Sequence, residues 1–230
     1  MSSSDFWALQ RRLLGHWLLA HSNRGGTRHL GILMSVQDDA EGKAQLSGFT
    51  QALAGLGWIE GGLKRVAMLF NPDSAPGHGT YYSRDFDAAA KLSKLELVSG
   101  RASNDVEIES VITSLSKAPN GGLVIMPDFF MFNHIEPITS PARENKVPAI
   151  YPWKFVVTKN AGLLSFGPGL NDIVRRGAAY IDRVLRGEKP ADFSVQVPVK
   201  FEMAINVKTA GALSLAVPPS MLLQADEVVE

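Results

Sequence analysis

The residue types that most often carry catalysis form no recognisable catalytic or metal-binding pattern in this sequence. It has no cysteine, which excludes a thiol nucleophile, a cysteine-ligated zinc site, an iron–sulfur cluster and a disulfide scaffold. The histidines show no metal-ligand spacing; they are His16, His21, His29, His78 and His134. The phosphate-binding loop G-x-x-x-x-G-K-[S/T], the G-x-S-x-G nucleophile elbow and the H-E-x-x-H zinc motif do not occur. The sequence therefore predicts a protein that is not an enzyme and has neither a metal nor a cofactor.

Polar and aromatic residues instead gather directly after short apolar runs. In a parallel sheet, such positions meet at the carboxyl edge, where ligands bind. Aromatic rings combined with a few polar groups suit the capture of a small organic molecule. The candidate ligand-binding residues are Ser35, Gln37, Asp38, Asn71, Asp73, Tyr81, Asp128, Phe129, Tyr151 and Ser165.

Most of these candidates also have a purely structural interpretation. Asp128 could pair with a ligand ammonium, or it could cap the first turn of a following helix. Asn71 could hydrogen-bond a ligand carboxylate or amide. Phe129 could belong to the core beneath the loops, whereas a buried Tyr151 would need a polar partner for its hydroxyl. The residue types alone leave these alternatives open.

The segments that must position these residues alternate between two hydrophobic periods. Short apolar or alternating runs predict strands at 30–34, 66–70, 95–98, 123–126, 147–151, 163–166 and 201–207. Helical spacing predicts helices at 44–56, 81–94, 106–115 and 171–187, with a further helix ending near 146. Asn104 or Asp105 is placed to cap the third of these, and Asn171 or Asp172 the fourth. This alternation predicts an α/β fold with a mostly parallel sheet and helices on both faces.

Composition agrees with a globular binding protein and excludes several other classes. The chain has 230 residues, which favours one to two domains. Its 23 basic and 23 acidic residues cancel, which argues against a nucleic-acid binder that relies on a global basic field. Hydrophobic residues make up 45% and charged residues 20%, a composition typical of folded chains. No run reaches the ~18 apolar residues that a membrane span needs.

Residues 1–28 have the outline of a weak secretory signal. Arg11 and Arg12 precede an apolar run over 13–20, and the triplet 20–22 is small-x-small. The run is short and is interrupted at Gly15, so a frayed or disordered arm is the alternative. We expect a periplasmic protein if this segment works and a cytoplasmic protein otherwise.

Several of these segments together resemble a known family. The similar stretches are RVAMLFNPDSAP at 65–76, NGGLVIMPDFF at 120–130, KVPAIYPWKFV at 146–156, the long run that begins AGLLSFGPGL at 161, and VPPSMLLQADEVVE at 217–230. They resemble the ABC-transporter substrate-binding proteins typified by bacterial tryptophan-binding lipoproteins. The stretch HLGILMSVQDDAEGKAQLSGFTQALAGLGWIEG at 29–61 is similar to that family's first strand and helix.

The resemblance implies a type I periplasmic-binding-protein fold, in which a ligand binds between two α/β lobes joined by a hinge. It implies an amino-acid-like small molecule as ligand and an ABC permease as partner, with no nucleic acid and no membrane span. Carried over by position, residues 35–38 would form the first-lobe edge of the cleft. Asn71, Asp73, Asp128, Tyr151 and Ser165 would line the second-lobe edge.

The sequence departs from the family's pattern after residue 60. Gly61-Gly62 leads directly into the second-lobe segment, so about three βα units, roughly 90–100 residues, are absent from the first lobe. We therefore expect an arm at 1–28, a first-lobe remnant at 29–62, a second lobe at 63–166, and a crossing helix, strand and C-terminal segment at 167–230 that pack toward the first lobe. The predicted function is the solute-binding component of an importer, degenerate or inactive if the truncation abolishes binding. The alternative is a ligand-sensing or interaction module that forms homo-oligomers through exposed first-lobe faces.

Overall fold

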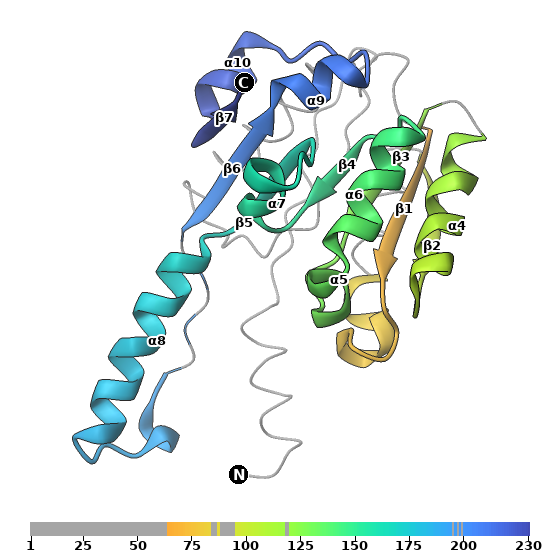
Figure 1. Cartoon of the computed structure of the whole chain (residues 1–230). Coiled ribbons are helices and arrows are strands. Elements are labelled where there is room, and N and C mark those ends of the chain that lie inside the picture. Colours follow the sequence, from red (N-terminus) through yellow and green to blue (C-terminus); the bar gives the residue numbers. More distant parts are fainter. Residues whose placement is uncertain are drawn as a thin grey trace, which may run out of the picture.

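The computed structural model describes residues 64–83, 87, 95–117, 120–194, 196, 198 and 200–230. In this part of the chain one sheet holds seven strands in the order β2-β1-β3-β4-β5-β6-β7 (Figure 1). The strands are β1 Arg65–Phe70, β2 Glu96–Arg101, β3 Gly121–Ile125, β4 Ala149–Tyr151, β5 Leu164–Pro168, β6 Phe201–Asn206 and β7 Glu227–Val229. Every neighbouring pair is parallel except β5 and β6, which are antiparallel. The expected α/β fold with a mostly parallel sheet is thus confirmed.

The helices follow the strands, as right-handed crossovers require. They are α4 Asp105–Ser116, α5 Phe129–Asn133, α6 Ile135–Glu144, α7 Lys154–Lys159, α8 Leu170–Leu185, α9 Val207–Ala212 and α10 Pro219–Gln224, with short 3-10 turns at Pro76–Gly79 (η2) and Pro190–Asp192 (η3). Asn104 caps α4, since its side chain accepts a hydrogen bond from the Glu107 amide at 2.9 Å.

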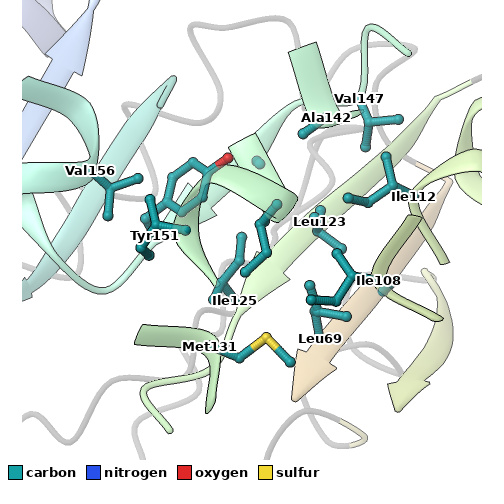
Figure 2. Close-up of a cluster of buried hydrophobic side chains, with 14 of the residues drawn as sticks. Leu69, Ile108, Ile112, Leu123, Ile125, Met131, Ala142, Val147, Tyr151 and Val156 are labelled. Carbon is teal, nitrogen blue, oxygen red and sulfur yellow. The ribbon is translucent and has the colours of Figure 1, made fainter. Parts of the chain in front are cut away.

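The sheet is buried on both faces, which explains why its central strands are continuously apolar. One face packs in a cluster with Val66, Met68 and Phe70 of β1 and with Met221 of α10. On the other face, Ala67 and Leu69 of β1 pack with side chains of α4, α6 and α7. Figure 2 shows this second cluster, with Ile108 and Ile112 of α4 near Leu123 of β3. Alternate residues of one strand thereby serve two separate cores.

Three features of the fold differ from the sequence predictions. Gly169, not Asn171 or Asp172, is the N-cap residue of α8, because β5 continues to Pro168 and the Gly169 amide bonds the carbonyl of Lys200 at 3.0 Å. Helix α7 was not predicted, since six residues are too few to show a helical period. The single helix expected to end near 146 is two helices, α5 and α6, which meet at His134.

The C-terminal segment continues the same sheet. β6 pairs along its length with β5, from Leu164↔Ile205 to Pro168↔Phe201. The predicted packing of 167–230 toward the first lobe involves residues 29–62, which lie outside the described residues. β7 then adds in parallel to β6. The apolar residues of β6 complete the core beside β5, which is the physical reason for this placement. The strand expected at 30–34 and the helix expected at 44–56 lie outside the described residues, as does most of the helix expected at 81–94.

Among the described residues, no helix combines the length and apolar character needed to cross a membrane.

Candidate functional site

Two loops meet at the carboxyl edge of the sheet, one after β1 and one after β3; we call them the edge loops. In the first, the side-chain oxygen of Asn71 accepts hydrogen bonds from the amides of Asp73 and Ser74, both at 2.9 Å. This arrangement closes an Asx turn. The Asn71 side-chain nitrogen donates to the Ala102 carbonyl at 3.0 Å, so the turn is also tied to the loop after β2.

Asp128 joins the two edge loops. Its Oδ2 accepts a hydrogen bond from the Asn71 amide at 2.9 Å. Its Oδ1 accepts from the Ser74 hydroxyl at 3.0 Å and from the Met131 amide at 2.9 Å, which caps α5. The side chain is buried. The capping interpretation of Asp128 is therefore correct, and the polar atoms of Asn71 and Asp128 hold the edge loops in place.

Two tyrosines, Tyr81 and Tyr82, lie close to the hydrogen-bond network formed by Asn71, Ser74 and Asp128. Burial raises the pKa of Tyr82 to about 12, and the negative charge of Asp128 adds to the effect. Tyr82 therefore stays a neutral phenol at physiological pH. The ring of Tyr81 meets that of Tyr82 edge-on, with 5.4 Å between centroids, and Tyr81 itself is exposed. The pair places one ring in the core and the other at the surface.

Three of the predicted site residues reach solvent at this edge. Phe129 is 75% exposed and Tyr81 is 43% exposed. Asp73, which precedes both in the chain, is also exposed. Because Asp128 caps α5, the first residue of that helix, Phe129, is held in a fixed backbone position. The sheet edge thus presents two exposed aromatic rings and one exposed carboxylate to solvent.

A second aromatic group lies beside the first. Phe132 of α5 is 41% exposed, and its ring packs edge-on against Trp153 and Phe155 at centroid distances of 5.2 Å and 5.5 Å. Trp153 is buried. The sequence itself indicates that the two rings are neighbours, because Phe132 follows Phe129 by three residues and so lies on the same side of a helix.

Tyr151 and Ser165 do not lie at this surface. They are register partners on β4 and β5, and both are buried beneath α7. Figure 2 shows Tyr151 among the apolar side chains of the second cluster, and burial raises the pKa of its phenol far above the ordinary value. The Ser165 hydroxyl is fully buried and has no hydrogen-bond partner among the described residues. Ser35, Gln37 and Asp38 lie outside the described residues.

The acidic groups of the edge loops differ in exposure. Within the described ranges, no group of three or more histidine, aspartate or glutamate side chains could hold a metal ion. The carboxylate of Asp128 accepts hydrogen bonds on both oxygens, which leaves Asp73 as the exposed acid of the edge loops.

The sequence matches one known protein family over most of its length. The sequence model of the family described as ABC transporter substrate binding protein matches residues 37–229. The chain belongs to this family. Among curated protein sequences, none matches it.

Solved structures with the same fold include substrate-binding proteins. A conserved domain protein from Vibrio cholerae matches with a TM-score of 0.67 and 20% identity over 77% of this chain and 59% of that chain. An ABC domain from Streptococcus pneumoniae, solved in complex with L-Trp, matches with a TM-score of 0.67 and 23% identity over 78% and 59%. The ligand-free, open structure of a substrate-binding protein with adhesive properties from Clostridium difficile matches with a TM-score of 0.54 and 18% identity over 78% of this chain and 59% of that chain. The chain thus spans about 59% of the length of these neighbours.

Proposed function

We propose that this substrate-binding chain captures a small organic molecule at the edge loops and that it does so without catalysis. The observation that carries the proposal is Phe129, an aromatic side chain that is 75% exposed and follows directly after the helix cap Asp128. Tyr81 supplies a second exposed ring on the neighbouring loop. Rings presented by a preformed edge lose little conformational entropy on binding, so they give affinity efficiently.

The proposed ligand is amino-acid-like and carries an aromatic or apolar group. The exposed rings suit such a group, and the exposed carboxylate of Asp73 suits a ligand ammonium. Membership of the family supports this choice, as does the structural neighbour that was solved with L-Trp. In this proposal the loaded protein delivers its ligand to an ABC permease from outside the cytoplasm.

The shortened first lobe is part of the proposal. We propose that the first lobe lacks a stretch between residue 60 and β1, and the coverage of about 59% of the length of the structural neighbours supports this. A cleft with fewer first-lobe contacts holds its ligand less tightly, because both contact area and exclusion of water decrease. We therefore propose binding that is weaker than in a complete two-lobed protein.

The test is a thermal-shift screen of the full chain against the twenty amino acids, with L-tryptophan as the first probe. A ligand that binds the native state raises the melting temperature as its concentration exceeds Kd. Phe129→Ala should abolish or strongly reduce the shift. Leu223→Ala, which removes an 88% exposed side chain on α10, is the matched control and should keep the shift. Absence of any shift at millimolar ligand, or an equal shift in both variants, would contradict the proposal.

A further inference from the structure

Arg101, the last residue of β2, places an exposed cation at the carboxyl edge of the sheet. Its register partner is Phe70, the last residue of β1, so both side chains point to the same face of the sheet. The guanidinium carbon lies 6.0 Å from the centre of the Phe70 ring, a cation–π contact. Among the described residues, Arg101 has no carboxylate as an ion-pair partner.

Hydrogen bonds hold the backbone next to Arg101 in place. The Ala102 amide donates to the Phe70 carbonyl at 3.0 Å, and the Ala102 carbonyl accepts from the Asn71 side chain, also at 3.0 Å. The Phe70 ring in turn packs against Gly79, where a Cβ atom would lie 2.1 Å from Cε2 of that ring. Arg101 therefore extends from a fixed position beside the loop that follows β1.

The other lysine side chains at the strand ends of this edge are already paired with carboxylates. Lys154, shortly after β4, lies 3.3 Å and 3.4 Å from carboxylate oxygens of β6 and β7. Lys200, directly before β6, lies 3.2 Å from a carboxylate oxygen of β6. The segments 71–82 and 126–134, which contain the edge loops, have neither lysine nor arginine. In the described part of this edge, Arg101 is thus the cation that a ligand can still pair with.

The acidic and amide groups that follow Arg101 in the chain are also engaged. Glu107 accepts hydrogen bonds from the Ser103 amide at 2.7 Å and from the Asn104 side-chain nitrogen at 3.0 Å. The Asn104 side-chain oxygen accepts from the Glu107 amide at 2.9 Å. Together these bonds cap the first turn of α4 from both sides. An anion at this position would therefore pair with the guanidinium of Arg101 and not with the amides of the helix.

We propose that Arg101 binds the carboxylate of the ligand and thereby makes the edge select amino acids over amines that lack this group. This inference rests on the proposed function, in which the ligand is amino-acid-like. A guanidinium presents paired N–H donors that match the two oxygens of a carboxylate. Asp73, the exposed acid of the edge loops, takes the ammonium in the same proposal. The two charged groups of an amino acid then each meet the opposite charge.

The test compares two ligands that differ in the carboxylate alone, L-tryptophan and tryptamine, by calorimetric titration of the full chain. We expect the parent chain to bind L-tryptophan at least about tenfold more tightly, the size of one charge-assisted hydrogen bond. Arg101→Gln should lower the affinity for L-tryptophan to that for tryptamine and should not weaken tryptamine binding. Tryptamine thus reports that the variant is folded.

Two further variants separate geometry from charge. Arg101→Lys keeps the charge but loses the paired donors, so it should restore part of the preference. Arg186→Gln removes an equal charge on α8, where the side chain pairs with Asp182 at 2.9 Å, and should keep the full preference. Bound L-tryptophan should also slow the modification of Arg101 by phenylglyoxal, read by mass spectrometry, and leave that of Arg186 unchanged.

The outcomes distinguish this inference from the function on which it rests. If neither ligand binds at millimolar concentration, the proposed function is wrong and the inference falls with it. If L-tryptophan binds and Arg101→Gln keeps the preference of the parent chain, the inference alone is overturned. Equal affinity of the parent chain for both ligands would also overturn it alone, as would modification of Arg101 at an unchanged rate under saturating L-tryptophan.

Discussion

Replacing Asp128 with alanine removes the acceptor of three hydrogen bonds at once. The Met131 amide loses its cap, which costs ~1 kcal/mol at a helix N-terminus. The buried Asn71 amide is left without a partner, which costs roughly 1–3 kcal/mol. The Ser74 hydroxyl is part-buried and can turn to water, so it adds little. We expect the free energy of unfolding to fall by about 3 kcal/mol.

The assay is denaturant and thermal unfolding of the full chain with two comparison variants. A loss of ~3 kcal/mol corresponds to a melting temperature roughly 6–12 °C lower for a domain of this size. Asp128→Asn keeps one acceptor oxygen for Met131 but turns an amide NH₂ toward Asn71, so we expect about half the loss. Ser74→Ala removes the hydrogen bond to Asp128 and a long one, at 3.4 Å, from the Phe130 amide, and should cost ~1 kcal/mol.

The predicted order of destabilisation is therefore Asp128→Ala, then Asp128→Asn, then Ser74→Ala. The denaturant slope should stay constant through the series, because the surface exposed on unfolding does not change. If Asp128→Ala unfolds within ~0.5 kcal/mol of the parent chain, the carboxylate does not hold the edge loops together. The reasoning about the network would then be refuted, even if ligand binding were lost.

Three further predictions concern positions around the same edge and core. In Gly79→Ala the new methyl would lie 2.1 Å from Cε2 of Phe70 at a φ of +87°, so we expect a loss of at least ~2 kcal/mol in thermal unfolding; parent-like stability would show that the turn can shift. Ser165→Ala removes a buried hydroxyl without a described partner, and the free energy of unfolding should stay constant or rise by up to ~1 kcal/mol; a clear loss would reveal a hidden partner. The pKa of Tyr82 is raised from 10.0 to about 12, so the folded state favours the neutral phenol. Its stabilisation is complete below pH 10 and is lost as the pH rises toward 12. Unfolding measured across that range should show a smaller alkaline loss in Tyr82→Phe, and identical profiles would contradict the cause.

The strands were predictable because consecutive apolar residues are the signature of a sheet buried on both faces. Runs such as 66–70 and 123–126 need no partner information to be recognised. The cap of α8 was not predictable, because the antiparallel partner β6 extends β5 to Pro168 and moves the start of the helix to Leu170. A local capping preference cannot include a strand that lies more than thirty residues later in the chain.

For the candidate site, too, the sequence indicated the positions and the tertiary structure decided the orientation of the side chains. Sequence alone placed Asp128, Phe129 and Tyr151 directly after or at the end of apolar runs, and sequence similarity indicated the family. Tertiary structure decided what each side chain does: Asp128 turns inward to the loop after β1, Phe129 faces solvent, and Tyr151 is buried. The physical reason is that orientation at a strand end depends on which helix covers it. Here α7 covers Tyr151, and in the described part of the chain nothing covers most of Phe129.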